Sequence, residues 1–250
     1  MKLRNTLGTV LAAAAGVIGM AAAPAMAAAP AATHAVTSHA KKTPQLTTSF
    51  SSTSVGYGSW VTINIHLGAT ASNRKVALYA KNWAGGAVYA AASGTVNRAG
   101  NLSVRYWVSQ TRTYWANFAG DASDNAVNSA GVAVHVGSET NGSFSGNYAT
   151  TSWGGHSVKE FHSSSVPALI GTVTPNKTGE NITVTAQYYN GNSWVSANQP
   201  KSFPLGYGSR FGIQFTSWPK GYEYRTVVSY GGDVSNGASN SGWEYWTITG

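Results

Sequence analysis

From residue 46 onward, the chain is a succession of short segments in which apolar and polar residues alternate one by one. In the segment WVTINIHL (60–67), Val61, Ile63, Ile65 and Leu67 alternate with polar residues. A period of two is that of a β-strand with one buried face, and this part of the chain has no sustained helical period. We therefore expect an all-β protein.

The number and spacing of these segments predict two antiparallel sandwiches. The first would occupy 46–137 and the second 142–250, with an extra N-terminal segment at 143–165 and the polar stretch GSETNG (137–142) as the turn between them. The strands expected in the first are 47–50, 60–67, 75–81, 87–96, 101–108, 113–119 and 131–136; the clearest in the second are 168–174, 181–189, 209–215, 222–230 and 243–249.

Two glycine-containing turns are expected to close hairpins. Asn190-Gly191 lies between strand-like flanks, and this dipeptide is the strongest short hairpin signal. Gly85-Gly86 occupies the matching place in the first half. Both halves are thus predicted to follow one strand plan.

The first 27 residues have the pattern of an export signal. Lys2 and Arg4 precede an apolar run, and Ala25-Met26-Ala27 supplies the small residues that signal cleavage requires. We expect cleavage after Ala27, a flexible leader at 28–45, and a secreted product without stable membrane insertion. The sequence contains no cysteine, so stability must come from apolar cores.

One polar block occurs twice, as GDASDNAVNS (120–129) and GDVSNGASNS (232–241). Asp side chains accept hydrogen bonds from nearby backbone N–H groups, and a preceding glycine permits unusual backbone angles. This favours a structural turn used once in each sandwich, built by Gly120, Asp121 and Ser129, and again by Gly232, Asp233 and Ser241. A calcium loop at Asp121, Ser123, Asp124 and Asn125 is the alternative, but the second copy replaces Asp124 with Asn236.

With the strands around them, these blocks resemble the bacterial immunoglobulin-like repeat domains of exported proteins from high-GC Gram-positive bacteria. An aromatic strand end, Gly-Asp, a polar loop ending in Ser and an alternating final strand carry the likeness in both halves. The resemblance implies two tandem immunoglobulin-like β-sandwiches. Such domains serve as spacers, adhesins and wall- or carbohydrate-associated modules, and no catalytic residues come with them.

The ionisable residues do not nominate an active site. Three Asp and five Glu are scattered, whereas a glycosidase needs two carboxylates facing one bond. Nucleophile and phosphate-binding motifs are absent, so neither catalysis nor a cofactor is expected. The 16 Lys and Arg form no cluster of the kind that follows a phosphate backbone, which argues against nucleic acid. His156, Glu160 and His162 have metal-like spacing but are interpreted as ordinary surface residues, so no metal is predicted.

The aromatic residues are more informative, because nine Trp and thirteen Tyr exceed what two small cores require. If Tyr114, Ala116 and Phe118 face the core, their strand neighbours Trp115 and Asn117 face outward. The same argument turns other residues outward, namely Tyr79 and Lys81 in the first half and Gln187, Tyr189 and Trp246 in the second. These residues are candidate ligand contacts; the alternative is that the rings cover sheet edges or pack between domains.

The sequence therefore predicts a secreted, non-catalytic structural or binding module. One alternative is a carbohydrate- or cell-wall-binding protein that uses the outward aromatics. A second is a secreted inhibitor or effector. The partners expected are cell-wall polysaccharide or an extracellular protein.

Overall fold

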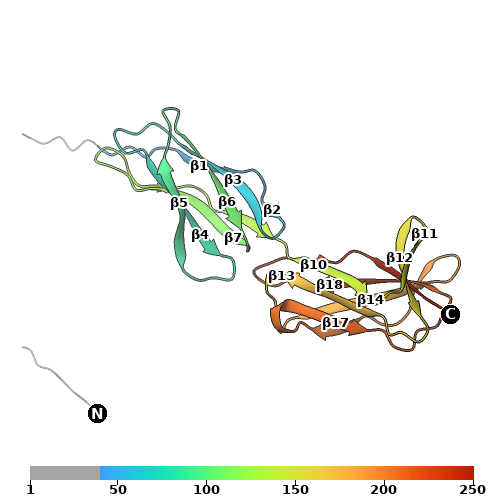
Figure 1. The fold of residues 1–250 in the computed structure, drawn as a ribbon. Helices are drawn as coiled ribbons and strands as arrows, with labels where there is room; N and C mark the ends of the chain where they lie inside the picture. The colour runs from blue at the N-terminus through green and yellow to red at the C-terminus, as the bar shows by residue number, and fades with distance from the viewer. Residues whose placement is uncertain (1–39) are drawn as a thin grey trace, which may run out of the picture. The chain divides into compact units, whose positions relative to one another are not determined.

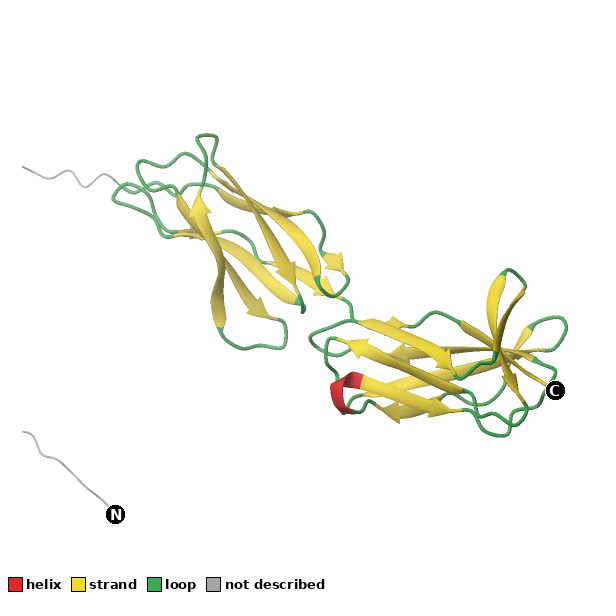
Figure 2. Ribbon diagram, in the orientation of Figure 1, coloured by secondary structure: helices red, strands yellow, loops and turns green. Residues whose placement is uncertain are grey.

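The computed structural model of the protein describes residues 40–250, and β-strands dominate this part of the chain (Figure 2). The helical content of these residues is one short 3₁₀ turn, η1 (Tyr207–Ser209). In 40–250, no helix is long and apolar enough to cross a membrane. The predicted signal peptide (1–27) and most of the predicted leader lie outside the described residues.

The first sandwich packs two sheets around one core (Figure 1). One sheet has the order β1-β3-β6, and the other has the order β2-β9-β7-β4-β5, with β8 paired to β7. Their strands are β1 (Leu46–Phe50), β2 (Ser54–Val55), β3 (Ser59–Leu67), β4 (Lys75–Asn82), β5 (Val88–Thr95), β6 (Asn101–Val108), β7 (Arg112–Phe118), β8 (Val127–Asn128) and β9 (Val132–Val136).

The second sandwich repeats this plan with an inserted hairpin, which consists of β11 and β12. Its smaller sheet has the order β10-β13-β17, and its larger sheet has the order β11-β12-β20-β18-β14-β15, with β16 also on β14 and β19 on β18. The strands are β10 (Glu139–Ser145), β11 (Ala149–Trp153), β12 (His156–His162), β13 (Ala168–Thr174), β14 (Asn181–Tyr189), β15 (Trp194–Ser196), β16 (Lys201–Pro204), β17 (Arg210–Gln214), β18 (Glu223–Tyr230), β19 (Ser239–Asn240) and β20 (Glu244–Thr249).

Strand order places both units in the sandwich class that the sequence predicted. In each sandwich, a strand near the N-terminal end pairs in parallel with the last strand: β2 pairs with β9 in the first sandwich, and β12 pairs with β20 in the second. The fifth strand of the first sandwich, β5, pairs with β4 rather than with β6. In the strand lettering of the immunoglobulin fold, β4 corresponds to strand C and β6 to strand E. Because β5 pairs with β4, it corresponds to strand C′ and not to strand D, which would pair with strand E.

Alternation accounts for the cores. On β3, Val61, Ile63, Ile65 and Leu67 are almost completely buried, while Asn64 and His66 between them are exposed. On β7, Tyr114, Ala116 and Phe118 are fully buried, as the sequence predicted. Because strand side chains alternate between faces, burial of one face determines the pairing register of the strands. The side chains of the other face then point away from the core.

Both predicted hairpins form. Tyr189 pairs with Trp194 across the loop that contains Asn190 and Gly191, and the Asn190 side chain accepts hydrogen bonds from the backbone N–H groups of Asn192 and Ser193 at 3.0 and 2.9 Å. Gly191 has a φ of 97°, which favours glycine. The Gly85-Gly86 turn connects β4 to β5.

Two boundary predictions need correction. The leader was expected to run to residue 45, but Lys42 donates its backbone N–H to the carbonyl oxygen of Ser123 at 3.0 Å and accepts from Asn125 at 2.7 Å. Pro44 is buried. The stretch 137–142 is not a turn throughout, because β10 begins at Glu139 and only Gly137 and Ser138 separate it from β9. Backbone pairing, which composition does not reveal, orders both segments.

Candidate binding surfaces

The repeated block forms the same turn in both sandwiches. In the first, Oδ1 of Asp121 accepts hydrogen bonds from the backbone N–H groups of Ser123 and Asp124, both at 2.8 Å. In the second, Oδ1 of Asp233 accepts from Ser235 at 2.8 Å and from Asn236 at 2.7 Å. The turn therefore uses the aspartate as a backbone acceptor, as proposed from the sequence.

The glycine and serine at the two ends of the block also have the same roles twice. Gly120 and Gly232 have φ angles of 80° and 81°, and a Cβ on either would come within 2.7 Å of a backbone atom. Ser129 Oγ accepts from the N–H of Ala116 at 2.9 Å, and Ser241 Oγ accepts from Val228 at 3.1 Å. The serine thereby ties the loop back to the preceding long strand.

The oxygens proposed for calcium are engaged in this turn. Oδ2 of Asp121 accepts from the backbone of Ser72 and Asn73 at 3.1 and 3.0 Å, and Oδ2 of Asp124 accepts from Ala71 at 2.7 Å. Hydrogen bonds from backbone N–H groups, first that of Asn73 and then those of Ser123, Ser72 and Asp124, hold the pKa of Asp121 well below its usual range. The carboxylates thus bind backbone donors of the neighbouring loop.

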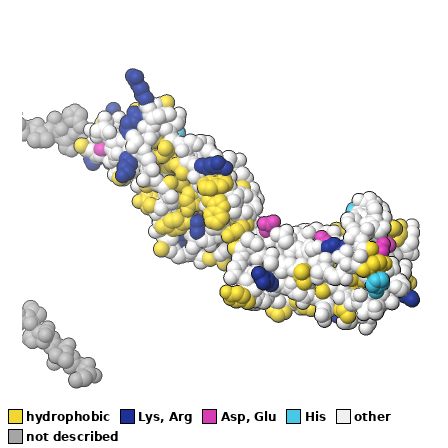
Figure 3. Space-filling model, in the orientation of Figure 1, with side chains coloured by type: hydrophobic (Ala, Val, Ile, Leu, Met, Phe, Trp, Pro, Cys, Tyr) yellow, Lys and Arg dark blue, Asp and Glu magenta, His cyan; other side chains and the backbone are white. Residues whose placement is uncertain are grey.

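The outward residues expected in the first sandwich form a continuous patch. Tyr79 on β4 lies directly opposite Trp115 on β7, and their ring centroids are 6.0 Å apart with 21° between the planes. Both rings are half-buried, and the small exposed residue Ala90 lies opposite Tyr79 on β5. We call Tyr79 and Trp115 the stacked pair. Figure 3 shows hydrophobic side chains gathered on the visible side of the first sandwich, with Lys and Arg side chains beside them.

Polar side chains flank the stacked pair. Asn117 donates from its amide to Oδ1 of Asn128 on β8 at 2.9 Å, which leaves further amide donors and acceptors at the surface. Lys81 is exposed two residues beyond Tyr79 on the same face of β4. Two near-parallel rings beside amides and one ammonium group are suited to a flat, hydroxyl-rich ligand.

In the second sandwich, the structure separates the three predicted residues. Gln187 and Tyr189 face outward, but the expectation for Trp246 is wrong: its side chain is completely buried in the core. Its indole N–H donates to Oγ1 of the equally buried Thr226 at 3.0 Å. Trp246 shares a strand face with the buried Ile248, and that parity places it inside.

The outer face that carries Gln187 and Tyr189 is occupied by an interlocked aromatic cluster. Trp194 packs edge-on against Trp153, Tyr189 and Tyr245, with centroid distances of 5.7, 5.6 and 5.8 Å. Arg225 lies between Trp194 and Trp243, at 4.5 and 4.3 Å from their ring centres, and donates to Gln187 at 2.7 Å. These rings cover one another, so the cluster holds the inserted hairpin against the sheet.

The metal-like trio of β12 does not converge on one point. His156 stacks on Tyr245 at 4.1 Å between centroids, and His162 stacks on Tyr148 at 3.9 Å. Glu160 accepts a hydrogen bond from the Tyr148 hydroxyl at 3.0 Å. The described residues contain no group of three or more metal-binding side chains.

Two glutamates lie on the outer face of the larger sheet, two strands apart. Glu160 and Glu223 pair with Thr247 from either side, so they flank it on one face. Burial, and second the charge of Glu160, raise the pKa of Glu223. Sequence spacing gave no sign of this, because the two residues lie on strands far apart in the chain.

A second aromatic surface lies on the opposite sheet of the first sandwich. Trp60 on β3 and Trp107 on β6 are directly paired, with 55% and 43% of their surfaces exposed, and Arg105 lies over Trp60 at 5.0 Å. These two residues were not among the predicted ligand contacts. The alternation nonetheless indicated them, since each directly precedes a core valine, Val61 or Val108.

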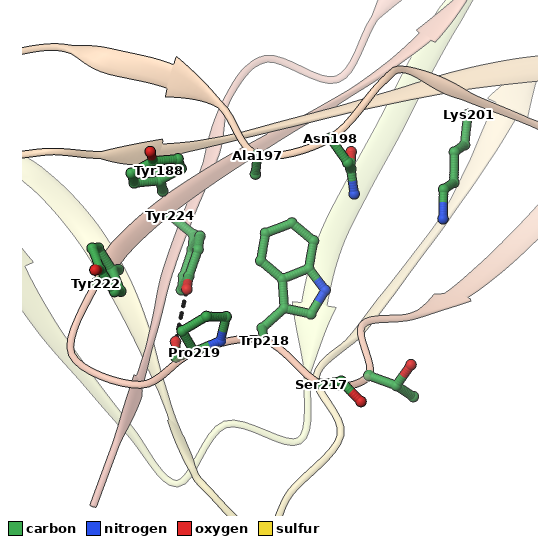
Figure 4. Close-up of a pocket in the computed structure, with 10 residues that line it drawn as sticks. Tyr188, Ala197, Asn198, Lys201, Ser217, Trp218, Pro219, Tyr222 and Tyr224 are labelled. Atoms are coloured by element: carbon green, nitrogen blue, oxygen red, sulfur yellow. Dashed lines mark hydrogen bonds between the residues drawn. The ribbon is translucent and has the colours of Figure 1, made fainter.

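A pocket of about 450 Å³ opens at the edge of the second sandwich (Figure 4). Its walls include Trp218, Tyr188, Tyr222 and Tyr224, and its rim carries Asn198 and Lys201. The Tyr224 hydroxyl donates to the carbonyl of Pro219 at 2.7 Å, and burial, with a smaller contribution from Tyr222, raises its pKa to about 12. No local pattern predicts this pocket, because loops that follow different strands form it.

Comparison with known proteins does not assign the chain to a family. No family model matches the chain, and no curated protein matches it. Among solved structures, a marsupial T cell receptor is 8% identical with a TM-score of 0.32, covering 82% of this chain and 73% of the receptor chain. The FN1-FN3 domains of chicken CNTN1 are 11% identical with a TM-score of 0.31, covering 84% and 68%. Both TM-scores are below 0.5, so the fold assignment rests on the strand pairing described above.

Proposed function

We propose that the protein is a secreted, non-catalytic binding module whose first sandwich binds cell-wall polysaccharide through the stacked pair. The observation that carries this proposal is the 21° angle between the planes of Tyr79 and Trp115 on an outer sheet face. A polysaccharide presents flat, apolar sugar faces bordered by hydroxyl groups. The rings would take the apolar face, and the amides of Asn117 and Asn128 would take the hydroxyls.

Charge agrees with an extracellular polymer as the partner. The whole sequence carries a formal net charge of +8, which becomes +6 when the signal with Lys2 and Arg4 is removed, and Lys81 lies at the border of the patch. Dilute positive charge attracts anionic wall polymers from a distance without specifying them. In this proposal the rings provide selectivity, and the charge raises the local concentration of polymer.

Sedimentation with insoluble peptidoglycan, chitin and cellulose tests the proposal. Trp115→Ala is expected to weaken retention by at least about tenfold, equivalent to about 1.4 kcal/mol. Trp115→Tyr keeps a ring and is expected to retain most binding. The matched control is Tyr207→Ala, which removes an aromatic side chain that is 94% exposed in the second sandwich.

Salt and a second surface sharpen the test. Retention by ring stacking should persist at about 0.5 M NaCl, whereas retention by charge alone is screened. Unchanged retention in both Trp115→Ala and Tyr79→Ala would refute the role of the stacked pair. Loss in Trp60→Ala alone would instead assign binding to the sheet that carries Trp60 and Trp107. Urea unfolding of each variant checks that the fold is intact.

A further inference from the structure

The pocket of Figure 4 lies where the two sheets of the second sandwich separate at one edge. The loop 197–200 and strand β16 form one rim, and the loop 216–222 after β17 forms the other. A smaller space of about 110 Å³ continues behind Trp218 toward the core residues Val184, Ile213 and Phe215. The indole of Trp218 therefore stands between solvent and the sandwich interior.

The aromatic walls are held in place before any ligand arrives. Trp218 packs against Phe215, Tyr224 and Trp246, with centroid distances of 5.6, 5.0 and 5.2 Å. Tyr188 packs edge-on against Tyr222 at 5.5 Å. The hydrogen bond from Tyr224 to Pro219 fixes the loop that carries Trp218. A preformed wall reduces the ordering that binding would otherwise require.

Three polar side chains of the pocket have no partners within residues 40–250. The Trp218 indole N–H, the Asn198 amide and the Lys201 ammonium group form neither a hydrogen bond nor an ion pair there, and Lys201 is the only charged residue among those that line the pocket. Figure 4 shows Asn198 and Lys201 extending from one rim toward Trp218, which rises from the other. Thr216 and Ser217 add hydroxyl groups beside them.

We infer that this pocket binds a sugar unit that carries a carboxylate, such as a uronic acid. The aromatic walls suit the flat face of a pyranose ring, the ammonium group of Lys201 suits the carboxylate, and Asn198, Thr216 and Ser217 suit the hydroxyls. A purely apolar ligand would cover these polar groups without pairing them, and a neutral sugar would gain nothing from the charge of Lys201. The pocket is separate from the stacked pair, so neither site requires the other.

Titration of the purified protein with sodium glucuronate and galacturonate, followed by tryptophan fluorescence and calorimetry, tests the inference. A ligand of this size is expected to bind with a Kd of about 1 mM, so the titration should reach about 20 mM. Glucose and galactose are the neutral counterparts, and sodium acetate controls for the carboxylate alone. We expect saturable binding of at least one uronate and binding of the neutral sugars at least about tenfold weaker.

Two lysine variants locate the site. Lys201→Met should weaken uronate binding about tenfold, whereas Lys220→Met, in the same loop as Trp218 but outside the pocket lining, should leave it unchanged. Both lysines are exposed, so neither substitution disturbs the core. The inference would be overturned if neither uronate bound saturably, or if the neutral sugars or acetate bound as tightly as the uronates. It would also be overturned if both lysine variants lost uronate binding equally. Trp115→Ala should not affect this titration, so the failure of one site is distinguishable from that of the other.

Discussion

Lys177 donates a hydrogen bond from its ammonium group to Oδ2 of Asp233, although only 6% of Lys177 is exposed. The ammonium group also lies 5.9 Å from the centre of the Tyr230 ring. In the first sandwich, Oδ2 of Asp121 binds backbone N–H groups of a neighbouring loop. In the second sandwich, Oδ2 of Asp233 binds a buried cation instead. The repeated aspartate is therefore an anchor between two loops in both copies.

Asp233→Asn should destabilise the second sandwich, because it leaves the buried ammonium group of Lys177 without its counter-charge. We expect the free energy of unfolding at pH 7 to fall by about 1–3 kcal/mol in urea denaturation. The double variant Lys177→Met with Asp233→Asn removes both charges and should recover much of this loss. Strictly additive losses would contradict a coupled pair.

The same pair predicts a dependence on pH. Burial opposes ionisation of Asp233, but the Lys177 hydrogen bond and the N–H groups of Asn236 and Ser235 outweigh it and lower the pKa. A carboxyl group with a lowered pKa stabilises the fold above its unfolded pKa of about 3.9 and loses this contribution as pH falls through its folded pKa. The stability difference between wild type and Asp233→Asn should therefore be constant from about pH 7 to 5 and shrink below about pH 4. A difference that grows on acidification would refute this assignment.

The contribution of Glu223 to stability should depend on pH with the opposite sign. Its Oε2 atom is buried without a hydrogen-bond partner in the described part of the chain, and burial and Glu160 raise its pKa. Ionising such a group costs stability as pH rises above its unfolded pKa of about 4.3. Glu223→Gln should therefore unfold at higher urea concentration than wild type at pH 7, with the gain disappearing near pH 3. Glu139→Gln, at an exposed position on β10, is the control and should change little.

The sequence predicted the orientation of a side chain correctly where apolar and polar residues alternate clearly along the strand. On β4 and β7, buried aliphatic residues set the phase, so the outward positions of Tyr79 and Trp115 followed from the pattern. On β20, Tyr245 and Trp246 are adjacent aromatics, and the phase is readable only from Ile248. The pocket beside Trp218 was beyond prediction, because its shape depends on where β16 and β17 diverge, and no local pattern encodes that separation.

The inserted hairpin illustrates the same limit. The sequence identified 143–165 as extra to the repeat, but not that β12 would pair in parallel with β20. Pairing of strands so distant in the chain depends on tertiary packing, here on the buried Val158 and Phe161. The placement of Glu160 and Glu223 on either side of β20 follows from that pairing, so the sequence did not indicate it either.

Gly171→Ala should be strongly destabilising, because a Cβ at this position on β13 would overlap the carbonyl oxygen of Asn141 and the ring of Phe211. Overpacking of this kind typically costs about 1–3 kcal/mol, measured as a lower urea midpoint. Gly212→Ala on the neighbouring strand is the matched control, since its nearest contact would be Ile170 at 3.9 Å. That variant should be neutral or gain up to about 1 kcal/mol. Equal effects of the two substitutions would contradict the close approach at Gly171.

The hydrogen bond from Trp246 to Thr226 should make these two residues energetically dependent on each other. Both side chains are fully buried, so Thr226→Val leaves the indole N–H without an acceptor and should cost about 1–3 kcal/mol. Trp246→Phe removes the donor but also opens a cavity, at a further cost of its own. Once the indole is gone, Thr226→Val no longer strands a donor, so the double variant should be more stable than the sum of the single losses predicts. Urea unfolding of the four proteins measures this coupling, and strict additivity would show that the bond contributes nothing to the stability of the second sandwich.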